Sequence, residues 1–149
     1  MKHLLSLLVI VSVVLLTSGS WAAGQATPDD AKAMAIKAAE YLRANGPEKA
    51  FPEFSAKDGP WHDRDLYVTV QDSKGVMVAH GDSQALIGKS MVDLKDVDGR
   101  PFIQEKLAIT DTGWINYKWR NPVTKAIEPK TQYVIRVGDY LVGVGAYAQ

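Results

Sequence analysis

The sequence predicts an α+β domain built on an antiparallel sheet of about five strands. Two observations carry this prediction. Apolar residues recur at helical spacing before residue 55, and they alternate at strand spacing from residue 66 onward. Helices and strands that segregate along the chain in this way are typical of α+β architectures, in which helices pack on an antiparallel sheet.

The chain begins with a segment typical of a secretory signal peptide. Lys2 and His3 precede an apolar run over residues 4–16, and Ser20-Trp21-Ala22 places small residues where a signal peptidase cleaves. The run is short for a spanning helix, which needs about 20 apolar residues. We therefore expect residues 1–22 to be a cleaved signal peptide and residues 27–149 to form one domain, with an uncleaved anchor as the alternative.

Charge and cysteine content narrow the function. The chain has 149 residues, with 17 Lys and Arg against 17 Asp and Glu, and it has no cysteine. Balanced charge gives no electrostatic reason to expect nucleic acid or an acidic membrane surface as a partner. The absence of cysteine removes disulfides, thiol catalysis and thiolate metal sites.

The first element is predicted to be a long helix that starts at Thr27-Pro28-Asp29-Asp30. Thr27 is suited to the N-cap, proline to the first helical position, and the two acids to the positive end of the helix dipole. The positions that share one apolar face are Ala31, Met34, Ala35, Ala38, Tyr41 and Leu42. Asn45-Gly46-Pro47 ends this helix, and a shorter helical piece is expected over residues 48–54.

The remaining elements are predicted to be strands interrupted by one helical crossover. Residues 66–72 and 76–80 alternate in polarity on either side of the turn Asp72-Ser73-Lys74-Gly75, which predicts a hairpin. Pro101 is suited to open a short helix, with Phe102, Ile103, Leu107 and Ala108 expected on its buried side. Three strands follow over residues 113–119, 131–137 and 140–147, the last two joined by Gly138-Asp139.

The sequence offers weak signals for metal binding or catalysis. Residues 94–105 place acids like those of an EF-hand loop, but Leu94 occupies the position of the first calcium ligand, so an acidic turn around Gly99 is the simpler interpretation. His80, Asp82 and Ser83 lie too close together in one loop to form a catalytic relay. The segment 61–64 is most simply a solvated loop. We therefore expect no metal, no cofactor and no enzyme activity.

Two strands carry features that suit either a core or a pocket. Ile115, Tyr117 and Trp119 share one face, which aromatic core packing alone would explain, although buried Tyr and Trp also need hydrogen-bond partners. Gly143 and Gly145 share a face of the last strand, so something must approach the sheet closely there. A packed helix and a ligand cavity both remain open at this point.

Several motifs in order resemble the single Cache domain of type 2, an extracytoplasmic relative of PAS domains found in bacterial chemoreceptors and histidine kinases. The resemblance covers residues 31–147. The motifs are Tyr67, Gly75, Ala79-His80, Ile87-Gly88-Lys89, Asp96-x-Asp98-Gly99, Gly113-Trp114 with Tyr117 and Trp119, Asn121-Pro122, Glu128-Pro129-Lys130, Tyr133 and Gly143-x-Gly145-x-Tyr147.

The resemblance implies a five-stranded antiparallel sheet, a long N-terminal helix and a pocket between the sheet and the helical crossover. Pockets of related sensors often take short organic acids. The positions that the resemblance assigns to the pocket are Tyr67, His80, Tyr117, Trp119, Lys130 and Tyr133. Lys130 is then the fixed cation and His80 a donor at the rim; the alternative is a surface Lys130 paired with an acid.

We therefore expect an exported module, periplasmic or secreted, that binds or senses a small anionic metabolite. The alternative is a ligand-free interaction protein that docks onto a membrane sensor, a transporter or another envelope partner. The sequence shows no second membrane segment or output domain before Gln149, which favours a free-standing domain. By analogy with receptors, we expect a monomer or a weak homodimer that pairs through the helix at residues 31–44.

Overall fold

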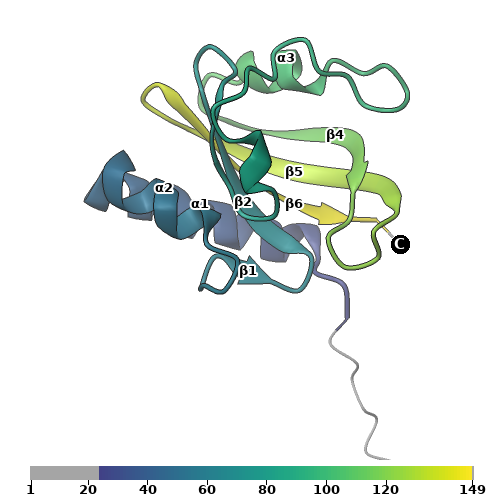
Figure 1. Cartoon of the computed structure of the whole chain (residues 1–149), viewed down its shortest axis with the longest axis horizontal. Helices are drawn as coiled ribbons and strands as arrows, with labels where there is room; N and C mark the ends of the chain where they lie inside the picture. Colours follow the sequence, from purple (N-terminus) through teal and green to yellow (C-terminus); the bar gives the residue numbers. More distant parts are fainter. Residues whose placement is uncertain (1–23, 149) are drawn as a thin grey trace, which may run out of the picture.

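The computed structural model describes residues 24–148, in which one antiparallel sheet has helices on both faces (Figure 1). The predicted signal peptide, residues 1–22, lies outside the described residues. In chain order the elements are α1 (Pro28–Asn45), α2 (Pro47–Ser55), β1 (His62–Asp63), β2 (Leu66–Asp72), β3 (Met77–His80), the 3₁₀ turn η1 (Gln84–Leu86), α3 (Phe102–Leu107), β4 (Thr112–Arg120), β5 (Ile127–Val137) and β6 (Tyr140–Tyr147).

The predicted sheet is confirmed, with one small addition. The five predicted strands pair in the order β3-β2-β6-β5-β4, and every pairing is antiparallel. The two-residue strand β1, which the sequence did not predict, pairs with the start of β2. The last strand of the chain, β6, therefore lies in the middle of the sheet, between strands that are far apart in sequence.

Helix α1 begins and ends as the sequence predicts. The Thr27 side chain accepts a hydrogen bond from the Asp30 amide at 3.2 Å, and the Asp30 carboxylate accepts one from the Thr27 amide at 2.9 Å, which completes a capping box. Gly46 ends the helix at φ 77°, a left-handed value that glycine adopts without strain. Among the described residues, no helix has both the length and the apolar character needed to cross a bilayer.

The two faces of the sheet have different chemistry because strand residues alternate between them. Val68 and Val70 of β2 pair with Val144 and Val142 of β6, and these valines face α1 and α2 in an apolar core. The opposite face carries many polar side chains and is covered by the crossover, residues 81–108, which includes α3. In Figure 1, α1 and α2 lie below the sheet and α3 lies above it. Any polar site inside this fold therefore lies on the crossover side.

The structure corrects two predictions about buried residues. Trp61 was expected in a solvated loop, but it is buried against Phe54 and Tyr41, with ring centroids 4.8 and 5.2 Å away. In α3, Ala108 was expected to be buried but is exposed, and the buried residue is Lys106. Phe102 and Lys106 are one helical turn apart, so they share the face that meets the sheet.

The acidic turn around Gly99 connects the crossover to the edge strand β4 through hydrogen bonds. Asp96 accepts hydrogen bonds from the backbone amides of Asp98, Arg100 and Lys118, each at 2.9 Å. Gly99 has φ 83°, the left-handed value expected from the sequence. These backbone bonds lower the pKa of Asp96 below its usual value. The turn therefore stabilises the position of the crossover over the sheet.

Candidate functional site

A small enclosed cavity lies between the sheet and the crossover. Its volume is about 20 Å³, which is room for about one water molecule. The polar and aromatic residues that line it include Tyr67, Thr69, His80, Lys106, Tyr117 and Trp119, from β2, β3, α3 and β4. Four of the six pocket positions named from the sequence (Tyr67, His80, Tyr117 and Trp119) line this one cavity.

Lys106 is the cation that lines the cavity. Its residue is 2 % exposed, and its ammonium group donates to the Thr69 hydroxyl at 3.3 Å. That hydroxyl also accepts from the Gln132 amide at 3.2 Å and donates to the Gly143 carbonyl at 3.3 Å, so it has no capacity for a further donor. A protonated lysine has three N–H donors, so Lys106 keeps two for a ligand.

Lys130 lies one side chain further from the cavity, behind Tyr67. It is 2 % exposed, and its ammonium group donates to the hydroxyls of Tyr67 at 2.9 Å and Tyr147 at 3.2 Å. The same ammonium lies 4.0 Å from the centre of the Tyr67 ring, a favourable cation–π distance. Its burial excludes the alternative of a surface lysine paired with an acid.

Glycines in the central strand β6 allow Lys130 and Gln132 to reach across the sheet. A side chain at Gly145 would lie 2.5 Å from Lys130 Cε, and one at Gly143 would lie 2.8 Å from the Gln132 amide carbon. Both side chains start on β5, cross over β6 and end at β2. The close approach expected at these glycines is therefore made by neighbouring side chains, neither by a helix nor by an open cavity.

Neither buried lysine has a carboxylate partner. The ion pairs among residues 24–148 lie on the surface, and none of them includes Lys106 or Lys130. Burial lowers the pKa of Lys106 to about 7. Burial, together with the nearby charge of Lys106, lowers the pKa of Lys130 to about 7 as well. The site thus holds two buried amino groups that no ion pair neutralises, although the charges of Asp82 and Asp65 act on Lys130 from a distance.

His80 is a neutral donor in this site. Its Nδ1 accepts hydrogen bonds from the backbone amides of Asp82 at 3.2 Å and Ser83 at 2.9 Å, which places the ring proton on Nε2. The ring stacks on Tyr67 with centroids 5.1 Å apart. Burial and the charges of Lys130 and Lys106 lower the pKa of His80 to about 3, so the ring stays neutral near pH 7.

Two aromatic residues of β4 close the site. Tyr117 stacks on Phe102 of α3 with centroids 4.2 Å apart and ring planes 5° from parallel. Trp119 lines the cavity and also lines an outer groove of about 430 Å³ that includes Arg120 and Lys125. Trp119 therefore separates the enclosed cavity from an open, partly cationic groove.

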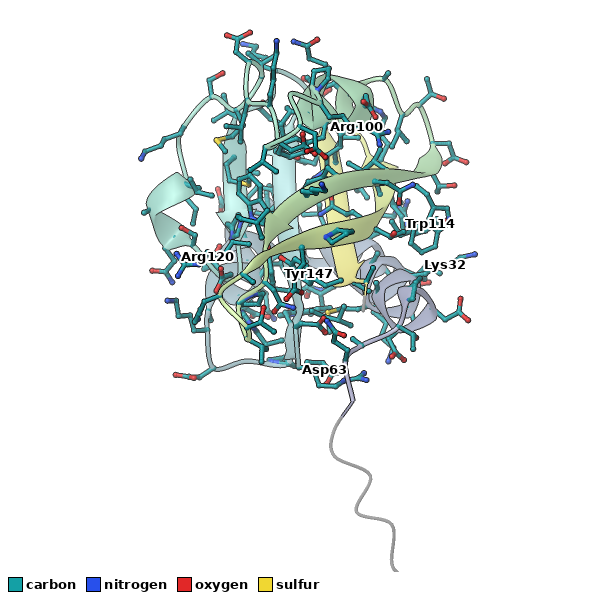
Figure 2. The ribbon with its side chains drawn as sticks, turned by 90° about the vertical axis from the view of Figure 1, so that its right-hand side faces the viewer. Lys32, Asp63, Arg100, Trp114, Arg120 and Tyr147 are labelled. Carbon is teal, nitrogen blue, oxygen red and sulfur yellow. The ribbon has the colours of Figure 1, made fainter. Side chains whose placement is uncertain are left out.

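Tyr133 does not belong to this site. It lies on the opposite face of the sheet, where its ring packs against Trp114 at 4.8 Å and lies 5.2 Å from the Lys32 ammonium. Figure 2 shows Trp114 and Lys32 together at the outer edge beside α1, whereas Tyr147 lies inside the fold. Alternation along β5 explains the difference, because Lys130 and Tyr133 are an odd number of residues apart.

The sequence reasoning missed polar residues that complete the site: Lys106, Thr69, Gln132 and Tyr147. Each has a signal in retrospect. Lys106 follows Phe102 at helical spacing, and Thr69 follows Tyr67 at strand spacing. Gln132 follows Lys130 in the same way, and Tyr147 pairs with Lys130 across the β5–β6 ladder.

Across residues 24–148, no three His, Asp or Glu side chains gather in a geometry that would hold a metal ion. The glutamate of the EF-hand-like segment, Glu105, accepts hydrogen bonds from the Arg100 guanidinium instead. The crossover side offers donors from Lys106 and His80, which could hold an anion, and also acceptors, because the side-chain oxygens of Gln71 and Gln132 are buried without a hydrogen-bond partner.

The fold and this enclosed site define a sensory domain of the PAS-like class. The chain belongs to the family described as single Cache domain 2, whose model matches residues 7–149. The domains of this family are sensory modules rather than enzymes. A search among curated proteins finds no match.

Solved structures of sensory domains share the fold. A methyl-accepting chemotaxis protein from Vibrio parahaemolyticus aligns with a TM-score of 0.70 and 23% identity, over 80% of this chain and 86% of its own. A Cache chemosensory domain described for carboxylic acid recognition aligns with a TM-score of 0.63 and 23% identity, over 81% and 88%. A periplasmic sensor domain of a chemotaxis protein aligns with a TM-score of 0.63 and 20% identity, over 81% and 90%.

Proposed function

We propose that this protein is an exported module that binds or senses a small organic acid through the cavity beneath α3. The observation that carries the proposal is the pair of buried lysines, Lys106 and Lys130, which have no carboxylate partner among the described residues. A buried cation without a counter-charge is unfavourable, and a carboxylate ligand supplies that charge.

The donors around the cavity suit one carboxylate. Lys106 offers its two free N–H groups, and His80 offers Nε2–H as a neutral donor. The Tyr67 hydroxyl accepts from Lys130 and donates to the Tyr147 hydroxyl at 3.2 Å, because the Tyr147 proton goes to the Arg120 carbonyl; these bonds fix the Tyr67 ring beside the cavity. Lys130 thus acts through Tyr67 as a positioning residue. Charge-assisted bonds of this kind are about twice as strong as neutral ones.

The volume of the cavity requires movement on binding. About 20 Å³ holds one water molecule, so even a two-carbon acid needs side chains to shift. The lining residue Met91 belongs to the crossover, and methionine adapts readily to a new occupant. Entry of an acid would therefore displace part of the crossover relative to the sheet, and this displacement is the signal that we propose.

The closed cavity also favours a second candidate function. A domain that never binds a small molecule would keep such a cavity small and would act by docking onto a membrane sensor, a transporter or another envelope partner. Native mass spectrometry of gently purified protein separates the two. We expect a co-purifying mass that fits a small acid; an empty protein in every preparation favours the docking function.

The proposed location outside the cytoplasm rests on the apolar segment at residues 4–16 and on the family of sensory domains. Intact-mass measurement of protein from an envelope fraction tests it. We expect a species that begins at Ala23 or Gly24, and a species that retains residues 1–22 would indicate an anchored domain instead.

The direct test of the function is a thermal-shift comparison of acids with their amides. Acetate, propionate and lactate should raise the melting temperature, whereas acetamide, propionamide and lactamide should not, at equal ionic strength. A ligand at 100 times its dissociation constant adds about 2.7 kcal/mol of stability, which such an assay resolves easily. Equal effects of acids and amides would contradict an anion site.

A further inference from the structure

We propose that the site binds its anion together with a proton, which Lys106 and Lys130 take up between them. This inference rests on the proposed function and adds a regulation by pH to it. The two ammonium groups belong to one site, because they bond to hydroxyls of residues that are neighbours on the same face of β2.

The geometry brings two like charges close together inside the protein. Lys106 donates to Thr69 and Lys130 donates to Tyr67, and these two partners are two residues apart on β2. The Cα atoms of residues at that spacing lie about 7 Å apart along a strand. The charge of Lys106 contributes to lowering the pKa of Lys130, because like charges repel each other more strongly inside a protein than in water. The empty site therefore does not hold both protons near neutral pH.

Other titratable groups do not compensate for this repulsion. Those near the two lysines are His62 of β1, Asp65 just before β2, Tyr67 of β2, His80 of β3, Asp82 just after β3, Tyr117 of β4 and Tyr147 of β6. Asp96, Asp98, Arg100 and Lys118 line an outer pocket together with Lys130. Asp65 and Asp82 raise the pKa of Lys130, but neither lies within ion-pairing distance. Burial raises the pKa of all three tyrosines, so they stay neutral.

A bound anion changes this balance. With the pKa of each lysine lowered to about 7, the empty site at pH 7.5 is short of protons. A carboxylate in the cavity favours the charged lysines and raises both pKa values, so binding draws protons from solution. The sign follows from linkage: above pH 7 the bound state holds more protons than the empty state, and affinity falls as pH rises.

Calorimetric titration of the full chain with sodium acetate at pH 7.5, in Tris and in Hepes, tests the proposal. The two buffers release different heats when they give up a proton, so the difference in binding enthalpy counts the protons taken up. We expect uptake of about half a proton or more, and an affinity that falls about threefold to tenfold per unit between pH 7 and 9.

Two variants sharpen the test. Lys130→Met removes one of the two groups that titrate near pH 7, so only Lys106 is left to take up a proton; we expect weaker binding with a smaller proton uptake than in the wild type. Lys74→Met changes an exposed lysine of the β2–β3 turn and should match the wild type in both respects.

The outcomes distinguish this inference from the proposed function. Binding of acetate with equal enthalpies in the two buffers and with a flat pH profile overturns proton coupling alone. A Lys130→Met variant that takes up as many protons as the wild type also overturns it. No binding of acetate, formate, propionate or lactate overturns the proposed function, and this inference with it.

Discussion

Replacing Lys106 by Met removes the one cation that lines the cavity while keeping most of the volume of its side chain. Met cannot donate to Thr69, so one hydrogen bond of 3.3 Å is lost, and with it the two donors free for a ligand. The variant therefore separates the role of Lys106 in binding from its role in packing.

The expected loss of affinity follows from the lost contact. A hydrogen bond between a charged donor and a carboxylate contributes about 1.5–3 kcal/mol. At about 1.4 kcal/mol per factor of ten, this range corresponds to an affinity lowered about 10-fold to 150-fold. Titration calorimetry with acetate at pH 6.5, where the lysines are largely protonated, measures the loss, with Lys74→Met as the surface control.

The same variant should not destabilise the empty protein. A buried cation without a partner disfavours folding, and replacing buried charges by apolar side chains of similar volume is often neutral or stabilising by about 1–4 kcal/mol. Denaturant unfolding without ligand measures this. Unchanged affinity for acetate, whatever the effect on stability, would refute the role of Lys106 as the residue that binds the anion.

Three further predictions use other parts of the site. Gly145→Ala should weaken acetate binding about tenfold or more, because the new methyl group displaces Lys130 from Tyr67. Calorimetry measures the affinity, and a wild-type value would show that the path of Lys130 over Gly145 does not matter for binding. His80 should stay neutral down to about pH 4 in an NMR titration, and a midpoint near 6.5 would contradict its buried environment. Its lowered pKa should also reduce the free energy of unfolding as pH falls from 6.5 toward 3, because the unfolded state then binds more protons than the folded state. Asp96→Ala should speed hydrogen exchange of the Lys118 amide, which loses its acceptor, and unchanged exchange would show that the crossover is held by other contacts.

Proton linkage gives an additional check on the lysines. Both have pKa values near 7 in the folded protein, below those of a free lysine, so the unfolded chain binds more protons between pH 7 and pH 9. The free energy of unfolding of the empty protein should therefore rise with pH across this window. Lys106→Met should show a smaller rise than the wild type, because one of the two groups is gone.

Local sequence patterns predicted much of the fold. The capping residues at Thr27, the helix stop at Gly46 and the hairpin turn at Gly75 act within a few residues, so their signals are visible in the sequence. Trp61 was misplaced because its burial depends on Phe54 and Tyr41, which meet it only in the folded protein.

The site was predicted only in part, and the reason is that its contacts cross the sheet. Strand alternation alone places Lys130 and Tyr133 on opposite faces, which makes the expected pairing of these two residues in one pocket wrong. The path of Lys130 over Gly145 to Tyr67 spans three strands and requires their register, which the sequence does not state. Lys106 was missed because a lysine at a helix position is ordinarily solvated.

The two buried lysines of the site lower the stability of the fold, as strained or charged functional groups commonly do. In the ligand-free protein, Lys106 and Lys130 are held by hydroxyl groups alone. A bound anion would remove that disadvantage. If an anion binds as proposed, binding should therefore raise the free energy of unfolding more than it would at an exposed pair of charges.

The central claim is that a carboxylate binds in the cavity against Lys106, with Lys130 behind Tyr67. A crystal structure of the protein grown with the acid that stabilises it most would test this claim directly. We expect the carboxylate within hydrogen-bonding distance of Lys106 Nζ and His80 Nε2, with Met91 and Phe102 shifted to make room. An acid bound in the outer groove beside Arg120, with the cavity still closed, would contradict it.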